Sequence, residues 1–227
     1  MSVPAPAARS YAQLCGVATA LDVIGDRWAA LVVRDLLLGP LRFGDFVDGL
    51  PGIGTNTLTA RLKQLESSGV VRRQLLPLPD RGTVYELTEY GRELEPIIMA
   101  LGRWGTRSMG RLPAGTVSRS RWLAAAMLAF HDPGRRIKRP TTWQLDLTDG
   151  PFAVQAKGKN LTVAAGPQPD ADLVITAADE TLHALLTGRV SPEEAVAAGT
   201  LTLRGDPLAL PRLLELFAFP ETDVPMS

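Results

Sequence analysis

The sequence predicts an α+β protein with two domains, and three observations lead to this expectation. The chain has 227 residues, and at roughly 100–200 residues per domain this length allows two small domains. Apolar residues follow helical spacings through most of the first half, whereas strand-like stretches fill much of the second. The formal net charge of zero hides two halves of opposite sign: residues 1–120 hold 14 basic and 11 acidic side chains, net +3, and residues 121–227 hold 10 and 13, net −3.

Composition disfavours several protein classes. A hydrophobic content of 45% is that of a globular chain rather than a disordered one. The longest apolar run, 29–38, is interrupted by Arg34 and Asp35 and is shorter than the roughly 18–20 residues of a membrane helix. The N-terminus lacks the basic start and apolar segment of a signal peptide. The single cysteine suits a reducing compartment, so we expect a cytoplasmic protein without membrane contact.

The first two elements are predicted to be helices. Residues 18–38 form one helix with an apolar stripe, ended by Gly39-Pro40; the stripe is Leu21, Ile24, Trp28, Leu31, Val32 and Leu36. Residues 42–50 form a short helix that buries Phe43, Phe46, Val47 and Leu50. Glycines and Pro51 then make a tight connection.

The third helix, 55–68, carries the first functional signal. Thr55 is its predicted N-cap, and Leu58, Leu62 and Leu65 line one face. Small and hydrogen-bonding side chains project from the opposite face: Asn56, Thr59, Ala60 and Lys63, with Arg61 at the flank. Such a face can read base edges in a DNA major groove, although an ordinary solvated helix has the same pattern.

A predicted hairpin follows directly. Residues 70–75 and 83–87 read as strands around a turn with Arg81 at its tip. Helix, short helix, turn, helix and hairpin is the order of a winged helix-turn-helix domain, whose wing reaches the DNA backbone or minor groove. The candidate DNA-binding residues are Thr55, Asn56, Thr57, Thr59, Lys63, Arg72, Arg73 and Arg81.

Thr88 is the predicted cap of a further helix with a long apolar stripe, formed by Leu94, Ile97, Ile98, Leu101 and Trp104. The stripe is longer than a small domain needs internally. Packing between two chains and packing on the domain's own core explain it equally well.

These segments resemble the winged helix regulators of the HxlR type over residues of about 11–107. The matching stretches are ALDVIGDRW (20–28), VRDLLLGPLRFGDF (33–46), LPGIGTNTLTARLKQLESSGVV (50–71) and YELTEYGRELEPIIMALGRWG (85–105). The resemblance implies a homodimeric bacterial transcription factor with 55–68 as recognition helix and 70–87 as wing. The first and last helices of the domain would form the dimer.

Cys15 is a candidate redox residue. Some regulators of this type use a cysteine near this place as a sensor, often as Cys-Pro where this chain has Cys15-Gly16. The alternative is a small buried hydrophobe near the dimer interface, which we favour because no cation close in sequence lowers the thiol pKa.

The second half begins with a polar linker, 108–120, and an Ala-rich helix, 121–130. Strands are expected at 142–147, 152–156, 161–165, 173–176 and 201–203, mostly as a meander with helices on one face. Asp179 is predicted to cap a helix, Ser191 to Glu194 to form a capping box with Pro192 first, and Asp206-Pro207 to open the last helix. That last helix would carry Leu210, Leu213, Leu214 and Phe217 on one side.

This half resembles a sterol carrier protein-like domain over about 120–219, in TWQLDLTDG (142–150) and the stretch 171–217. The resemblance implies an α/β domain with an apolar tunnel for fatty acyl or sterol-like molecules, serving as a ligand sensor or dimer support. The candidate lining residues are Trp122, Met127, Phe130, Trp143, Leu185, Leu186, Leu213, Leu214 and Phe217. Plain core packing produces the same periodicity.

Catalysis and metal binding are not expected, and neither is a cofactor. The chain has two histidines, His131 and His183, with no His/Cys cluster at metal-ligand spacing, no nucleophile elbow, no Gly-rich phosphate loop and no CxxC. The acidic pairs Asp170/Asp172 and Glu193/Glu194 are better explained as turn or cap residues.

We therefore predict a dimeric DNA-binding regulator with a DNA-binding and dimerisation domain at 1–112 and a ligand-binding domain at 113–227. Its partners would be double-stranded DNA with an inverted-repeat operator, a second copy of the chain and an apolar small-molecule effector. The alternative is a carrier of lipids or other hydrophobic small molecules that has no DNA function.

Overall fold

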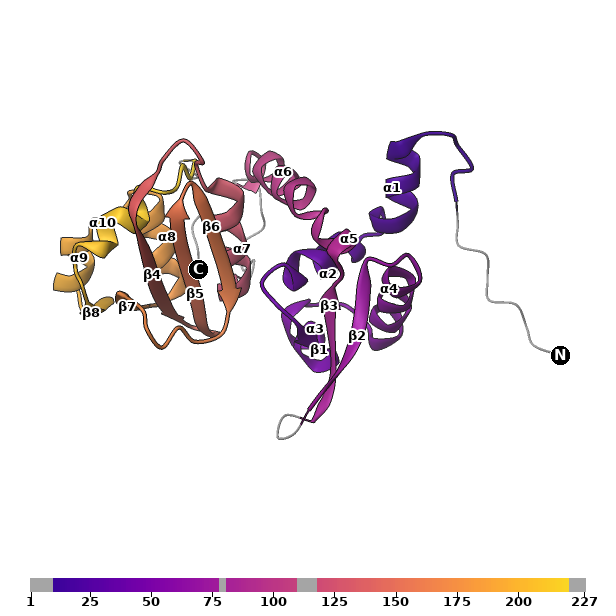
Figure 1. Cartoon of the computed structure of the whole chain (residues 1–227), viewed down its shortest axis with the longest axis horizontal. Helices are drawn as coiled ribbons and strands as arrows, with labels where there is room; N and C mark the ends of the chain where they lie inside the picture. Colours follow the sequence, from indigo (N-terminus) through magenta and orange to yellow (C-terminus); the bar gives the residue numbers. More distant parts are fainter. Residues whose placement is uncertain (1–9, 78–80, 110–117, 221–227) are drawn as a thin grey trace. The chain divides into compact units, whose positions relative to one another are not determined.

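The computed structural model describes residues 10–77, 81–109 and 118–220. The chain divides into two compact units, Met1–Ile98 and Met99–Ser227, which we describe separately (Figure 1). Helix and sheet are both present, as the predicted α+β class requires. The predicted domain boundary at 112/113 lies outside the described residues and stays a prediction.

The helices of the first unit are α1 (Gly16–Ile24), α2 (Ala29–Leu36), α3 (Phe43–Gly49), α4 (Thr55–Ser67) and α5 (Glu89–Arg92), and α6 (Glu95–Thr106) runs from this unit into the second. The predicted single helix over 18–38 is wrong, because α1 ends at Ile24 and a separate helix, α2, starts at Ala29. Gly25 packs so closely on the Leu21 carbonyl that a Cβ would collide with it. The Asp26 carboxylate then accepts a 2.9 Å hydrogen bond from the Trp28 N–H, and a new helix starts.

The core of the first unit forms where α4 packs on the other helices. Leu58, Leu62 and Leu65 are buried, as predicted. Phe46 and Leu50 are also buried, whereas Phe43 and Val47 are half-buried. Thr55 is not the N-cap of α4. Gly54 takes that position with an extended backbone, and Thr55 is the first helical residue.

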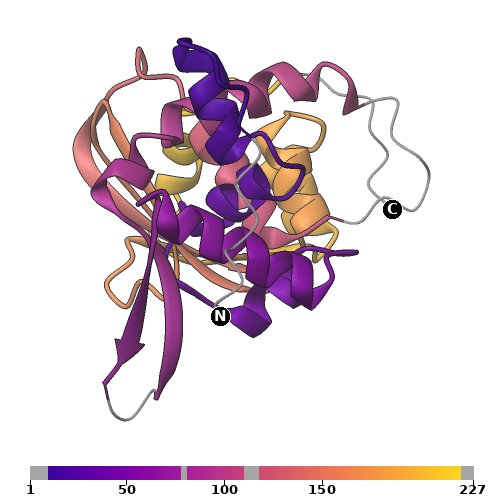
Figure 2. The same cartoon turned by 90° about the vertical axis from the view of Figure 1, so that its right-hand side faces the viewer.

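Three antiparallel strands complete the first unit: β1 (Leu41–Arg42), β2 (Val71–Leu76) and β3 (Gly82–Leu87), in the order β1-β3-β2. The hairpin of β2 and β3 is confirmed, and it extends beyond the helices of its own unit (Figure 2). The strand β1 was not predicted, because two residues are too few to show an alternating pattern.

Two helices follow the hairpin instead of one, and the predicted apolar stripe lies on the second, α6, apart from Leu94 just before it. Thr88 caps α5 as predicted, since its hydroxyl accepts a 3.0 Å hydrogen bond from the Gly91 N–H. The helix then stops at Arg92 and α6 starts at Glu95. Pro96 has no N–H to donate to a carbonyl one turn earlier, which prevents a continuous helix.

The second unit is a five-stranded mixed sheet with helices on one face (Figure 1). Its strands are β4 (Ile137–Leu147), β5 (Gly150–Gly158), β6 (Asn160–Ala165), β7 (Leu173–Ala177) and β8 (Leu201–Gly205), and its helices are α7 (Ser120–Phe130), α8 (Asp179–Leu186), α9 (Pro192–Ala197) and α10 (Ala209–Leu214). The predicted strands are present. The sheet order is β6-β5-β4-β7-β8, and β7 pairs in parallel with β4, so the sheet is not a simple meander.

Alternation along β4 builds the core of this unit. Thr141, Trp143, Leu145 and Leu147 are buried, and the residues between them are half-buried. The Trp143 Nε1–H donates a 2.9 Å hydrogen bond to the Ala209 carbonyl, which joins β4 to the start of α10. The indole therefore anchors a helix while its ring fills the core.

Two predicted helix starts in the second unit need correction, and one is confirmed. The last helix, α10, starts at Ala209 with Leu208 as its N-cap, not at Asp206-Pro207. Ala178, not Asp179, is the N-cap of α8; the buried Asp179 carboxylate instead accepts a 2.6 Å hydrogen bond from Ser120 Oγ. The capping box of Ser191 and Glu194 is present with Pro192 at the first position. Phe217 lies beyond the end of α10 and pairs with His131, so it does not share the helix face.

Candidate nucleic-acid interface

The outward face of α4 is polar and accessible. Thr55, Asn56, Thr59 and Lys63 are exposed, and Thr57 is half-buried. This follows from the helical period, because the three buried leucines occupy the opposite side. The face thus presents an amide, hydroxyls and one ammonium group, which together can donate to and accept from base edges or phosphates.

The hydroxyl of Thr59 is already engaged within the helix. Thr59 Oγ1 donates a 2.8 Å hydrogen bond to the Thr55 carbonyl, one turn earlier. Its oxygen lone pairs and its methyl group remain outward. Thr59 can therefore accept a hydrogen bond or contact an apolar group such as a thymine methyl, whereas Asn56 and Lys63 are the better donors.

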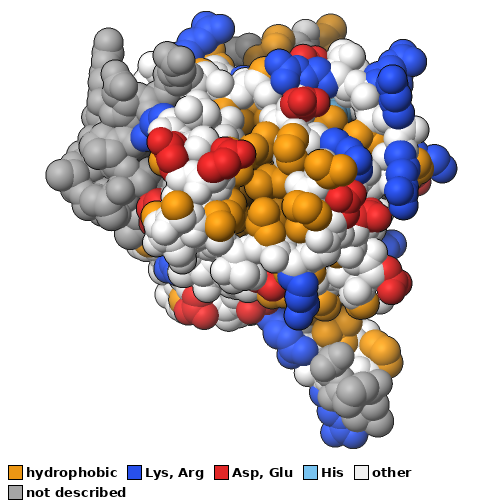
Figure 3. Space-filling view, turned by 90° about the vertical axis from the view of Figure 1, so that its left-hand side faces the viewer, with side chains coloured by type: hydrophobic (Ala, Val, Ile, Leu, Met, Phe, Trp, Pro, Cys, Tyr) orange, Lys and Arg blue, Asp and Glu red, His pale blue; other side chains and the backbone are white. Residues whose placement is uncertain are grey.

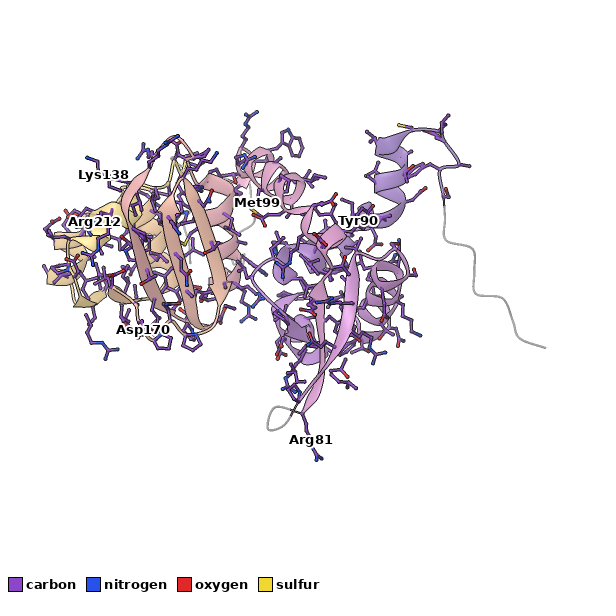
Figure 4. All side chains as sticks on the ribbon, in the orientation of Figure 1. Arg81, Tyr90, Met99, Lys138, Asp170 and Arg212 are labelled. Carbon is purple, nitrogen blue, oxygen red and sulfur yellow. The ribbon has the colours of Figure 1, made fainter. Side chains whose placement is uncertain are left out.

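The three predicted cations of the hairpin have different surroundings. Arg72 Nε lies 2.7 Å from the Glu86 carboxylate on the neighbouring strand, which compensates its charge. The Arg73 guanidinium lies over the Tyr85 ring, 5.8 Å from its centroid. Arg81 is exposed, and its side chain projects from the end of the hairpin in Figure 4. Arg81 is thus the most accessible of the three.

Sequence reasoning missed the partners of three polar side chains in this unit, Gln64, Arg61 and Arg42. Gln64 Nε2 donates a 2.9 Å hydrogen bond to the Asp22 carbonyl, near the end of α1, and Arg61 Nε lies 3.1 Å from the Asp26 carboxylate. At the hairpin, Arg42 of β1 donates a hydrogen bond from its Nη1 to the carbonyl of Arg81. The motif LRFGDF contains Arg42, but its partner is 39 residues away, and nothing local points to it.

Cys15 is exposed at the N-cap of α1, so its interpretation as a buried hydrophobe is wrong for the single chain. The backbone N–H groups of Ala18 and Val17, at the open start of the helix, hold the pKa of the thiol below its ordinary value. The signal that sequence reasoning lacked was a helix beginning directly after Cys15.

Large apolar side chains are exposed on two helices of the predicted dimer region. Leu14, Val17 and Leu21 are exposed at α1, and Ile97, Leu101 and Trp104 are exposed on α6. Ile98, from the same predicted stripe, is buried. One part of the stripe is therefore buried and the larger part is exposed, and its role in a dimer stays a prediction.

Most of the predicted ligand-lining residues lie in the interior of the second unit. Met127, Trp143, Leu185, Leu186, Leu213 and Phe217 are buried, whereas Trp122, Phe130 and Leu214 are half-buried. They come from α7, β4, α8 and α10 and from the segment after α10. Apolar side chains also gather on the outer face of this unit seen in Figure 3, with charges of both signs around them.

The titratable groups of the second unit have structural roles. Burial lowers the pKa of His183, and the neighbouring Arg189 lowers it further; burial also lowers the pKa of His131. The Thr142 N–H lowers the pKa of Asp172, and the Ser191 N–H lowers that of Glu194, as expected of turn and cap residues. Among residues 10–77, 81–109 and 118–220, no three His, Cys, Asp or Glu side chains gather as metal ligands would.

Comparison with known proteins assigns the first unit. The model of the HxlR-like helix-turn-helix family matches residues 23–112. The uncharacterized HTH-type transcriptional regulator sll1512 of Synechocystis is 39% identical over 94 residues, which cover 41% of this chain and 69% of that protein. The chain belongs to the HxlR-like helix-turn-helix family. YdeP of Bacillus subtilis, another such regulator, is 37% identical over 98 residues, 43% of this chain and 77% of its own length.

The second unit has its own match, to the SCP-2 sterol transfer family over residues 133–217. This HxlR-type chain is therefore a transcriptional regulator that carries an SCP-2 domain, and both predicted resemblances are confirmed. Solved structures similar to it include the redox regulator HypR in its reduced form, at TM-score 0.39, 35% identity, 41% of this chain and 93% of that one. The reduced form of YodB from B. subtilis is similar at TM-score 0.38, 32% identity, 42% of this chain and 94% of that one.

In the part of the chain that the structure describes, no helix has both the length and the apolar character that crossing a membrane requires.

Proposed function

We propose that this regulator binds double-stranded DNA as a homodimer, with α4 in the major groove and the β2–β3 hairpin on the backbone or minor groove. The observation that carries the proposal is the exposed polar face of α4. The helix itself packs beside β2, and β2 belongs to a hairpin that bears exposed arginines. A lipid carrier without DNA function has no need for this combination. DNA binding further favours a cytoplasmic location.

Within the interface we assign roles by accessibility and chemistry. Asn56 and Lys63 donate to base edges or phosphates, with Thr55, Thr57 and Thr59 around them. Arg73 and Arg81 bind phosphates or enter the minor groove. Arg72 contributes less, because Glu86 already holds its guanidinium.

The charge balance makes these few cations important. The first 120 residues carry a net charge of only +3, so non-specific attraction to DNA is modest and is readily screened by salt. Local contacts from Lys63, Arg73 and Arg81 must then supply most of the electrostatic affinity.

The dimer rests on the exposed apolar side chains of α1 and α6. Large apolar patches on soluble proteins mark interaction sites, and a two-fold axis would present two α4 helices. Two half-sites would then lie roughly 34–36 Å apart on an inverted repeat.

We further propose that the SCP-2 domain binds an apolar effector among the side chains of α7, β4, α8 and α10. The supporting observation is that large apolar side chains of these elements, among them Met127, Trp143 and Leu213, are fully buried in a domain of a sterol transfer family. The effector alters DNA affinity to the extent that it prefers one conformation of the dimer.

The DNA interface is tested by salt titration. Lys63→Ala and Arg81→Ala should each weaken binding to the protein's own upstream DNA and reduce the salt slope of log K by about one, as loss of one phosphate contact requires. Lys159→Ala removes the same charge from the turn between β5 and β6 and should leave the slope unchanged.

Two results would contradict the proposal: no binding to any DNA at low salt, or an unchanged slope for both variants. Repeating the titration with delipidated protein and with added palmitate tests the effector. Equal affinities in both, together with no palmitate adduct by native mass spectrometry, would exclude a fatty acid in that role.

A further inference from the structure

The short strand β1 places an arginine beside the middle of β3, the second strand of the hairpin. Leu41 pairs with Tyr85 and Arg42 with Val84, so β1 runs along the outer side of β3. The Arg42 backbone N–H also donates a 2.6 Å hydrogen bond to the Asp45 carboxylate at the start of α3. The backbone of Arg42 is thus fixed between the hairpin and the helical core.

The side chain of Arg42 reaches past its own pairing partner to the end of the hairpin. Its Nη1 donates a 3.0 Å hydrogen bond to the carbonyl oxygen of Arg81. Arg81 itself is exposed and directs its side chain outward (Figure 4). The contact therefore links the helical core to the backbone of the most accessible cation of the hairpin.

Gly82 shows how closely the Arg42 guanidinium lies to the backbone next to Arg81. Its φ of +147° is a conformation that side chains rarely adopt. A Cβ at this position would collide with Nη1 of Arg42 and lie 3.3 Å from its Cζ. The guanidinium thus lies directly against the backbone at residue 82, where the positive φ already favours glycine.

A two-stranded ribbon needs such support, because an isolated hairpin is only marginally stable in water. The strands β2 and β3 pair from Val71–Leu87 to Leu76–Gly82. Arg42 contacts Arg81, the residue directly before the start of β3. A cation that contacts DNA from an unsupported ribbon would have to be ordered on binding, at a cost in affinity.

We propose that Arg42 is a positioning residue for the hairpin: its guanidinium fixes the backbone at Arg81 and Gly82 and thereby aims Arg81 at DNA. This role rests on the DNA-binding function proposed above. It differs from a direct role of Arg42 at a phosphate, in which its contribution would be independent of Arg81.

A double-mutant cycle separates the two roles. Arg42→Met, Arg81→Ala and the double variant are titrated with the upstream DNA by fluorescence anisotropy at several salt concentrations. If Arg42 acts through Arg81, Arg42→Met weakens binding several-fold alone but by less than about two-fold in the Arg81→Ala background, since coupled residues are non-additive. The salt slope falls by about one in each single variant and no further in the double.

Additive losses with a slope reduced by about two would show a direct phosphate contact and would overturn the positioning role. Unchanged binding of Arg42→Met, or of Arg81→Ala, would overturn it as well. Arg92→Met is the matched control, because it removes an exposed arginine from α5 and should leave binding unchanged.

Limited trypsin digestion tests the contact without DNA, so that failure of the positioning role is distinguished from failure of DNA binding. Cleavage of the Arg81–Gly82 bond, followed by mass spectrometry, should accelerate several-fold in Arg42→Met, whereas cleavage after Arg136 in the second unit keeps its rate. Equal acceleration at both bonds, or none at either, would overturn the proposal.

Discussion

At the scale of single residues, the setting of each side chain decided its chemistry more than its type did. Arg72, Arg73 and Arg81 are alike in sequence, yet one is held by a carboxylate, one lies over an aromatic ring and one is accessible. Asp179 was predicted as a cap and is instead a buried acceptor for Ser120. Partners from distant positions made these differences.

Cys15 supplies the prediction at this scale. Because the N–H groups of Ala18 and Val17 favour the thiolate, the pH midpoint of iodoacetamide alkylation should be lower in the native protein than in urea. By linkage, this interaction stabilises the fold above the unfolded thiol pKa and is lost as pH falls through the folded pKa. Cys15→Ser serves as the unlabelled control. An equal or higher native midpoint would show that the helix start does not act on the thiol.

At the scale of elements, the side-chain amide of Gln64 on α4 joins this helix to the end of α1. The Gln64 amide donates to the carbonyls of Asp22 and Val23, among the last carbonyls of α1, which have no partner within that helix. This hydrogen bond helps to fix the position of α1, with its exposed apolar residues, relative to α4. A break in this link should affect α1 before it affects the rest of the fold.

Gln64→Leu is expected to loosen the end of α1, because it removes a part-buried hydrogen bond worth about 1 kcal/mol and keeps a similar volume. Amide hydrogen exchange in α1 should then accelerate about five-fold at 25 °C. Exchange in β4 and β5 provides the internal reference and should be unchanged. Uniform acceleration throughout the chain would mean that Gln64 acts on global stability instead.

At the scale of the whole molecule, two families of domain are joined in one regulator. The first carries a polar interface and exposed apolar helices, and the second carries an apolar interior behind a mixed sheet. The formal charge of zero describes neither half. The small basic excess of the first half suits the DNA-binding role proposed for it.

The dimer is the prediction at this scale. Leu101→Glu combined with Trp104→Glu should convert a dimer to a monomer in sedimentation velocity, because loss of a central aromatic anchor costs about 2 kcal/mol or more, roughly 30-fold in the dissociation constant. Val196→Glu is the matched control, since Val196 is equally apolar and exposed but lies on α9. A monomeric wild type, or dissociation by the control variant, would contradict the assignment to α6.

The sequence by itself determined the α+β class, the hairpin after a polar helix, and both domain families. Local periodicity and turn chemistry encode the class and the hairpin, since the leucines of α4, Thr88 as the cap of α5 and the capping box at Ser191 are read within a few residues. The two families came from the resemblance of longer stretches of sequence. Tertiary structure decided what depends on distant partners. The break between α1 and α2, the parallel pairing of β7 with β4 and the position of Phe217 follow from how the segments pack. The contact of Arg42 with Arg81 is of the same kind, because a hydrogen bond between residues 39 apart leaves no periodic trace in the chain.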